Sequence, residues 1–369
     1  MKSIKINNNN NIINSKLNEI QSPRELKIFK QIIREENQNS NYILFKSIYD
    51  LILLVFINNR KHSIIAYNLI DNKKIFEIKK ANEFILNDIK HYFDKNNKRD
   101  LVSSISVGDS NIKVWNFNDL ECILNINFRF DNFGFLLNSV CFLNNGKDIH
   151  LIASNIGVHR TQLIHIYNLR GEKIKEINNN KLRNYFIDTF YDDKFLKNYI
   201  IISTNADIRA IDYNDNKIVK HYTLVNEQPI KVTSIKDVQG NTHKFVNYSE
   251  GPIYIILKKC GNITKLFAGM EENTIKIWNF HSTQLLSEIS IPKLTIKSIC
   301  LWDEENLLVG TGGGLKMIDL NKNKLVKNNT DIIDIARMDI CTIPKYGKCL
   351  ITKGYNGMNL WINKNLIKK

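Results

Sequence analysis

Glycine and hydroxyl residues at short spacing can bind phosphate groups, and one such stretch lies near the C-terminal end of this chain. Residues 310–314 read Gly-Thr-Gly-Gly-Gly. A phosphate-binding loop would continue with Gly-Lys-Ser or Gly-Lys-Thr, and the chain continues with Leu315 and Lys316 instead. Because the stretch joins two apolar runs, it predicts a hairpin turn that needs a positive φ.

Histidine, cysteine and carboxylate side chains could support metal binding or catalysis, but their spacing favours neither. The six cysteines are scattered and form no Cys-x-x-Cys pair, which a zinc site would favour. The eight histidines are isolated, with His159 and His165 six residues apart. Asp109, Asp207 and Asp212 fall in or beside expected turns, where such residues cap the backbone. The sequence therefore predicts a protein that is not an enzyme and uses no metal or cofactor.

One segment concentrates the residue types that anchor protein interfaces. Residues 125–135 read NINFRFDNFGF, which places four phenylalanines around an arginine and an aspartate. Aromatic and arginine side chains contribute most of the binding energy in many interfaces. An alternative stays open, in which the alternating phenylalanines extend a buried strand. The candidate partner-binding residues are Phe128, Arg129, Phe130, Phe133 and Phe135.

The chain is basic, with 52 Lys and Arg against 37 Asp and Glu, a net charge of +15. Such a balance can indicate binding to nucleic acid. Most of the basic residues are lysines spread along the chain, whereas readers of phosphates and base edges favour arginine. The charge is therefore interpreted mainly as a general lysine-rich bias of the composition, with no role in binding. A nucleic-acid-associated protein remains the alternative.

Two nearly identical hexapeptides indicate that the chain repeats itself. Ile-Lys-Val-Trp-Asn-Phe (112–117) recurs as Ile-Lys-Ile-Trp-Asn-Phe (275–280). A search for the same triad, an aromatic residue or Ile, then Asn or Asp, then a bulky apolar residue, finds more copies spaced by 48, 52, 44, 67, 40 and 43 residues. The triads begin at Tyr67, Trp115, Tyr167, Ile211, Trp278 and Ile318, with a degraded copy at Trp361.

Each repeat contains four short apolar runs separated by turn residues. In residues 100–128 the runs LVSSISVG, IKVWNF and CILNINF are divided by DSN and NDLE. Runs of β-branched and aromatic residues divided by Asn, Asp and Gly are typical of hairpins. One further apolar run precedes each group of three, so the repeat predicts four antiparallel strands. Seven such units predict an all-β fold, a seven-bladed β-propeller.

The stretches GDSNIKVWNF and GMEENTIKIWNF resemble the third-strand signature of the WD40-repeat family. The resemblance covers roughly residues 42–362 and implies a scaffold that binds protein partners, often within a multi-subunit complex. Departures from the family pattern are clear. No Gly-His dipeptide is present, and Asn replaces the Asp of Trp-Asp in four repeats. Some related propellers bind phosphoinositides through a Phe/Leu-Arg-Arg-Gly motif, but Leu169-Arg170-Gly171 has one Arg and predicts an ordinary turn.

The spacing of 67 residues between the fourth and fifth triads requires an insertion. It falls near residues 225–250, where IKVTSIKD and THKFVNY flank Gln239-Gly240-Asn241. This pattern predicts an extra hairpin that projects from the ring. A partner-binding arm and a mere decoration are both open interpretations of this hairpin.

The first 40 residues differ from the propeller expected over 41–369. Ser22-Pro23-Arg24-Glu25 has the form of a helix N-terminal cap, and Leu26, Phe29, Ile32 and Ile33 follow at helical spacing. A short amphipathic helix is therefore predicted over 23–36. The last repeat lacks a fourth strand, which residues 3–6 or 11–14 could supply to close the ring.

The longest purely apolar run, Leu51 to Ile57, is too short to span a membrane, and the first residues do not form a secretory signal. We therefore expect an intracellular protein of the cytoplasm or nucleus. The predicted function is a non-catalytic scaffold that presents its loop faces to protein partners. A nucleic-acid-associated propeller is the first alternative, and a phosphoinositide-binding propeller is a weaker one.

Overall fold

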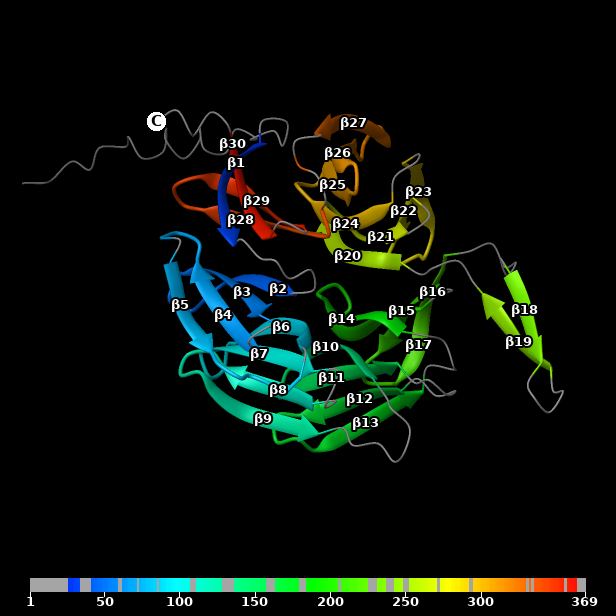
Figure 1. The fold of residues 1–369 in the computed structure, drawn as a ribbon. Helices are drawn as coiled ribbons and strands as arrows, with labels where there is room; N and C mark the ends of the chain where they lie inside the picture. Colours follow the sequence, from blue (N-terminus) through cyan, green and yellow to red (C-terminus); the bar gives the residue numbers. More distant parts are fainter. Residues whose placement is uncertain are drawn as a thin grey trace, which may run out of the picture.

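The computed structural model describes residues 26–33, 41–58, 62–71, 73–84, 86–106, 111–127, 136–156, 163–178, 184–204, 207–224, 231–236, 242–247, 252–270, 273–291, 295–329, 332, 335–354 and 357–363. All regular structure in these residues is β-strand, and the sheets are arranged as a ring (Figure 1). No helix in this part of the chain is long and apolar enough to cross a membrane. The all-β class predicted from the sequence is confirmed.

Seven four-stranded antiparallel sheets form the blades of a propeller, as predicted. Each of blades 1 to 6 uses four strands that are consecutive in the chain and in the sheet. Blade 1 consists of β2 (Tyr42–Lys46), β3 (Ile52–Asn58), β4 (Ser63–Asn68) and β5 (Lys73–Ile78). Blade 2 consists of β6 (Leu86–Asp94), β7 (Arg99–Ser106), β8 (Asn111–Asn116) and β9 (Glu121–Asn127). Blade 3 consists of β10 (Leu136–Asn144), β11 (Ile149–Ile156), β12 (Leu163–Asn168) and β13 (Lys173–Asn178). Blade 4 consists of β14 (Asn184–Asp192), β15 (Lys197–Thr204), β16 (Asp207–Asp212) and β17 (Lys217–Thr223). Blade 5 consists of β20 (Pro252–Cys260), β21 (Ile263–Met270), β22 (Thr274–Asn279) and β23 (Leu285–Ser290). Blade 6 consists of β24 (Ile296–Leu301), β25 (Asn306–Thr311), β26 (Gly314–Asp319) and β27 (Lys324–Asn329).

The seventh blade joins the two ends of the described chain. Its strands are β28 (Arg337–Ile343), β29 (Gly347–Gly354), β30 (Gly357–Asn363) and, as the fourth, β1 (Leu26–Ile33). β1 runs antiparallel to β30, with Leu26 opposite Asn363 and Ile33 opposite Met358. This pairing closes the ring, because it covers the edge that β30 would otherwise expose.

The closing strand corrects one expectation from the sequence. The helix predicted over 23–36 is a strand across residues 26–33, while the rest of that range lies outside the described residues. Helical spacing of apolar residues is a weak local preference, and the open edge of β30 offers a ladder of backbone hydrogen bonds that outweighs it. Residues 3–6 and 11–14, the closing strands suggested by the sequence, also lie outside the described residues.

The repeated triads mark the ends of the third strands, as the sequence indicates. At the first residue of the triad, blades 1 to 6 share an irregularity in the pairing of the third and fourth strands. In each blade one residue of the fourth strand is skipped in the register, which is a bulge that increases the twist. The skipped residues are all apolar: Ile75, Ile123, Ile174, Val219, Leu286 and Val326.

The insertion between blades 4 and 5 forms the predicted extra hairpin. Strands β18 (Lys231–Lys236) and β19 (Thr242–Asn247) pair in an unbroken antiparallel register. They form a separate two-stranded sheet that shares no ladder with a blade. Figure 1 shows the hairpin standing away from the ring.

The hydrophobic core is divided among the interfaces between blades. The described residues contain seven clusters of buried apolar side chains, and each cluster joins two neighbouring blades. One cluster packs Tyr42 and Leu54 of blade 1 against Ile351 and Leu360 of blade 7. The ring is therefore closed by apolar packing as well as by the strand pair β1 and β30, and the blades form a stable support for the turns.

Candidate binding surface

The two faces of the ring carry different connections. Turns between the first and second strands, and between the third and fourth strands, lie on one face because neighbouring strands are antiparallel; we call this the turn face. The opposite face carries the turns between second and third strands and the connections from one blade to the next. Most turns of the turn face lie within the described residues.

The central Asn or Asp of each triad organises a turn on the turn face. In blades 1 to 6 its side-chain oxygen accepts a hydrogen bond from the backbone N–H two residues later, at 2.9–3.4 Å. This is the Asx-turn that such residues favour. The structural role predicted for Asp212 is confirmed, and the other triads share it. The acceptors are Asn68, Asn116, Asn168, Asp212, Asn279 and Asp319.

Two of the tryptophans donate a hydrogen bond inside their own blade. Trp115 Nε1 donates to Ser104 Oγ at 3.1 Å, and both residues are buried. Trp361 Nε1 donates to Thr352 Oγ1 at 2.7 Å in blade 7. Blade 5 has no such pair, because Ala268 stands at the register position that corresponds to Ser104. Trp115 and Trp361 are therefore core residues whose indole N–H is satisfied.

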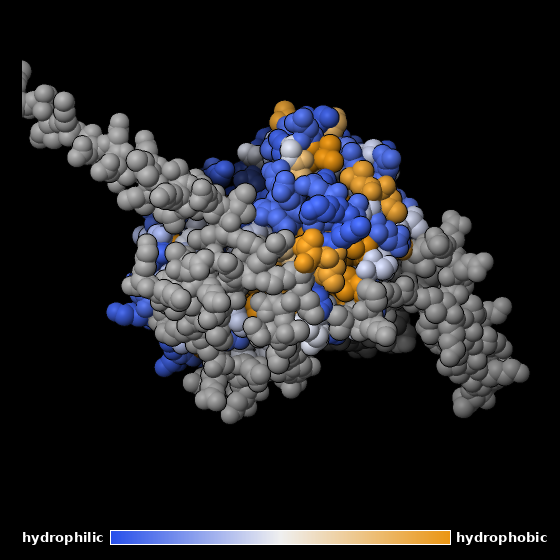
Figure 2. Space-filling view, turned by 90° about the horizontal axis from the view of Figure 1, so that it is seen from above, coloured by the Kyte–Doolittle hydropathy of each residue, from blue (hydrophilic) through white to orange (hydrophobic). Residues whose placement is uncertain are grey.

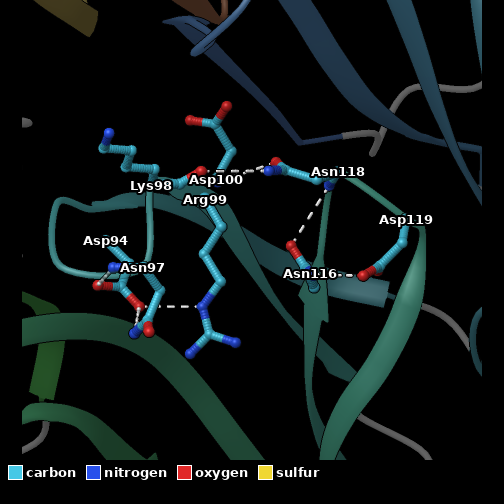
Figure 3. A network of polar contacts seen from close by, with 8 residues as sticks. All are labelled: Asp94, Asn97, Lys98, Arg99, Asp100, Asn116, Asn118 and Asp119. Carbon is cyan, nitrogen blue, oxygen red and sulfur yellow. Dashed lines mark hydrogen bonds and ion pairs between the residues drawn. The ribbon is translucent and has the colours of Figure 1, made fainter.

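Blade 2 holds the polar network shown in Figure 3. Asp94, which is 1% exposed, accepts hydrogen bonds from Asn97 Nδ2 at 2.7 Å and Arg99 Nε at 2.9 Å. Burial alone would raise the pKa of Asp94, but the hydrogen bonds from Asn97 and Arg99 outweigh burial and lower the pKa. Asp94 is therefore ionised at neutral pH and holds Arg99 at the turn face.

Asp100 of the same network connects two blades. Its Oδ2 accepts a hydrogen bond from the backbone N–H of Ile48 in blade 1 at 3.0 Å, and its Oδ1 lies 2.8 Å from His91 Nε2. Asn118 Oδ1 accepts from the backbone N–H of Asp100 at 3.2 Å, as Figure 3 shows. These contacts fix blade 1 against blade 2, so the network is structural.

Several lysines also connect blades. The lysines of both hexapeptides donate to a carbonyl at the end of the preceding blade, Lys113 to Ala81 at 2.7 Å and Lys276 to Leu224 at 2.8 Å. Ammonium groups used in this way contribute positive charge without presenting it to a partner. Three more inter-blade bonds are Lys175 to the Tyr213 carbonyl, Lys220 to the His281 carbonyl and Lys348 to the Trp302 carbonyl.

The first strands of the blades surround the middle of the ring (Figure 1), and charged side chains lie on them. Ser139 Oγ donates to Asp88 Oδ2 at 3.0 Å, which joins blades 2 and 3. Burial alone would lower the pKa of Lys90, but Asp88 and Asp188 outweigh burial and raise it, so Lys90 remains charged.

In blade 7, a second cation on a first strand is held by aromatic and acidic side chains. The Arg337 guanidinium lies 4.6 Å from the centre of the Tyr42 ring, and its Nε lies 3.4 Å from Asp339 Oδ2. The centre therefore carries cations and carboxylates together, rather than one sign of charge.

The cavities between blades in the described residues include the following three. The cavity of about 720 Å³ lies between blades 1 and 7, where its walls include Leu44, Phe45 and Ile340. The cavity of about 540 Å³ lies between blades 2 and 3 and includes Arg99 and Arg170. The third, about 320 Å³, lies between blades 4 and 5. No group of three His, Cys, Asp or Glu side chains in the described residues is arranged to hold a metal ion.

The site residues predicted from the sequence have different outcomes. Phe128, Arg129, Phe130, Phe133 and Phe135 all lie outside the described residues, so their proposed role stays a prediction. The glycine-rich stretch is confirmed as a turn between β25 and β26, with φ of +117° at Gly314. Leu169-Arg170-Gly171 is likewise an ordinary turn, in which Gly171 has a φ of +85°.

One feature of the turn face has no counterpart in the sequence-based expectations. The turn between β14 and β15 exposes Phe195 and Leu196, which are 51% and 75% accessible. The sequence signal was present as DKFLK (193–197), an apolar pair inside a polar turn. It was not recognised because the exposure of an apolar pair depends on which part of the turn it occupies.

The fold defines a class of protein, the seven-bladed β-propeller. No protein-family model matches the chain. No curated protein matches it in sequence either. The resemblance to WD40 repeats therefore rests on the repeat pattern and on the propeller architecture that the pattern predicts.

Proposed function

We propose that this chain is a non-catalytic scaffold whose loops and inserted hairpin bind protein partners in a multi-subunit assembly. The closed ring supports this proposal, because its seven inter-blade cores and its closing strand provide a firm base for projecting segments. Propellers are widely used for protein interaction, although a fold by itself does not define a function. The WD40-like repeats point in the same direction.

The hairpin β18 and β19 is the observation that carries the proposal. It pairs with no blade, so the outer edges of both strands are left without a sheet neighbour among the described residues. An isolated two-stranded hairpin is only marginally stable in water. Exposed strand edges are also templates for pairing with another chain. A partner strand that adds to one edge would complete the sheet, a common mode of protein recognition.

The distribution of polar and apolar residues on the surface fits a protein that binds partners at a few small sites. Figure 2 shows hydrophilic residues predominating among the described residues on the side viewed, with hydrophobic residues in separate groups between them. A scaffold that binds through a hairpin edge and selected turns needs no large apolar face.

The proposal is tested by replacing residues 231–247 with a short Gly-Ser linker in the tagged full-length chain. Because the hairpin pairs with no blade, we expect the thermal midpoint to remain close to that of the wild type. Affinity purification from the cells that produce the protein should then lose one or more stable co-subunits. Leu325→Ser, on the outer strand of blade 6, is the matched control and should retain all of them.

Two outcomes would contradict the proposal. A wild-type chain that purifies without any stable partner would oppose the scaffold function itself. If the chain without the hairpin still co-purifies with all of its partners, the hairpin has no role in partner binding.

A further inference from the structure

The turn between β14 and β15 in blade 4 differs from the equivalent turns of blades 2, 3 and 5. Blade 2 has the polar residues 95–98 at this place, blade 3 has Asn145-Gly146-Lys147-Asp148, and blade 5 has Gly261-Asn262. Blade 4 instead places Phe195 and Leu196 in the turn, with Tyr191 just before it.

Nothing in the blade structure shared by the described residues requires these three side chains to be exposed. Tyr191, Phe195 and Leu196 are 50%, 51% and 75% accessible. On the outer strands, exposed apolar residues such as Ile75, Ile174, Val219 and Leu286 occupy the bulge that blades 1 to 6 share. The turn of blade 4 has no such shared structural role, so its apolar residues need another explanation.

The backbone makes Leu196 a poor choice for stability. Its φ is +52°, in the left-handed region that glycine tolerates and that a bulky side chain disfavours. At the equivalent places blades 1 and 2 use Asp50 and Lys98, and blade 5 uses Gly261. A leucine that is both strained and 75% exposed stabilises neither the turn nor the core, and such local conflicts are concentrated at functional sites.

A cavity of about 320 Å³, with both polar and aromatic residues in its walls, lies directly beside the turn, between blades 4 and 5. Tyr191, Lys194 and Lys259 contribute to its walls, together with the pair formed by His281 and Asp192, whose Nε2 and Oδ2 atoms are 2.7 Å apart. The ring of Phe195 lies 5.3 Å from that of His281, centre to centre. The apolar ledge and the cavity therefore form one continuous surface, which we call the blade 4 ledge.

Charge at the blade 4 ledge favours an acidic occupant. Lys194 and Lys259 are exposed cavity residues, and Asp193 is the one exposed carboxylate among the described residues lining the cavity. Asp192 is buried and paired with His281. Exposed aromatic residues beside cations are the side chains that anchor interfaces.

We propose that the blade 4 ledge binds a segment of a partner protein in which an apolar side chain is flanked by carboxylates. The apolar side chain packs on Phe195 and Leu196, and the carboxylates face Lys194 and Lys259. A protein segment suits this surface better than a membrane, because a polar side chain of the segment can fill the cavity. This inference rests on the proposed scaffold function and names one of its contact sites.

The test uses the purified full-length chain and a random library of peptides about nine residues long. Selection on the wild type should enrich peptides that combine Leu, Phe or Met with Asp or Glu. For an enriched peptide measured by fluorescence anisotropy, Phe195→Ser with Leu196→Gly should raise the Kd by about tenfold or more. Lys194→Gln with Lys259→Gln should raise the Kd and flatten its dependence on salt.

Two controls separate binding from folding. Glycine adopts positive φ readily, so Leu196→Gly should leave the thermal midpoint unchanged or raise it. Tyr49→Ser, at a 65% exposed position in the equivalent turn of blade 1, should leave the Kd unchanged. An equal loss of affinity in Tyr49→Ser would overturn the assignment to blade 4.

Other outcomes also overturn the inference. The library could enrich no peptide, or only basic peptides. The ledge residues could instead be required for binding vesicles of phosphatidylcholine and phosphatidylserine, or for self-association in sedimentation equilibrium. If the ledge fails these tests while the wild type still co-purifies with hairpin-dependent subunits, only the ledge is excluded and the scaffold function stands.

Discussion

At the scale of single residues, the repeated hexapeptides serve the blade rather than a ligand. The Asn of the triad holds the turn that follows, and the Lys holds the preceding blade. The Trp fills the core, and in blade 2 its indole N–H is satisfied by Ser104. Each position of the motif therefore has a structural partner.

The hydrogen bond between Trp115 and Ser104 provides the first residue-scale prediction. Trp115→Phe removes the indole N–H, so the buried Ser104 hydroxyl loses its hydrogen-bond donor. This loss should lower the free energy of unfolding by about 1–3 kcal/mol, in addition to the cost of replacing the larger indole ring in the core. Trp278→Phe in blade 5 is the matched control, because Ala268 replaces the serine there. A double-mutant cycle with Ser104→Ala, followed by chemical denaturation, measures the coupling. Equal losses in blades 2 and 5 would contradict the prediction.

At the scale of elements, the ring depends on a strand that is distant in sequence from its partner. β1 and β30 lie near opposite ends of the chain, and six residue pairs define their register. The same closure brings blade 1 against blade 7 through a shared apolar core. Removing β1 would expose an unpaired edge at the seam of the ring.

A chain that lacks residues 1–33 should therefore be less stable. With a net contribution of about 0.5–1.5 kcal/mol for each hydrogen bond, the loss of this ladder should lower the free energy of unfolding by about 3 kcal/mol or more. The measurement is chemical denaturation, with light scattering to follow aggregation. A synthetic peptide of residues 22–36 should restore stability when added to the truncated chain. Unchanged stability would show that β1 is dispensable for closure.

At the scale of the whole molecule, the net charge of +15 has a partly internal use. Five lysines donate to carbonyl groups of neighbouring blades, and the ring centre mixes Lys90 and Arg337 with carboxylates. A count of basic residues therefore overstates the charge that is free to contact nucleic acid.

This distribution predicts weak binding to RNA. In a titration of a labelled single-stranded RNA at about 50 mM salt, we expect no saturable binding, because five lysines are engaged between blades and the ring centre carries both signs of charge. Polylysine serves as the positive control. Tight binding that weakens steeply as salt is raised would contradict the prediction and favour the nucleic-acid alternative.

Much of the fold could be predicted because its determinants are local and repeated. Alternating apolar runs define the strands, Asn and Asp define the turns, and seven copies of one triad define the number of blades. The inserted hairpin was likewise predictable from its two strand patterns around Gln239-Gly240-Asn241. The blade 4 ledge was not, because an apolar pair in DKFLK has the same local pattern whether it is buried or exposed.

By itself, the sequence determined the repeat, the strand pattern of each blade and the structural role of the triads, since these depend on residues close together in the chain. Only the tertiary structure decided that residues 26–33 form the closing strand, that Lys113 and Lys276 join blades, and that Phe195 and Leu196 face outward. These outcomes depend on partners far away in sequence. The edge of β30 prevails over a local helical pattern because it offers a ladder of backbone hydrogen bonds, and no local pattern records that edge.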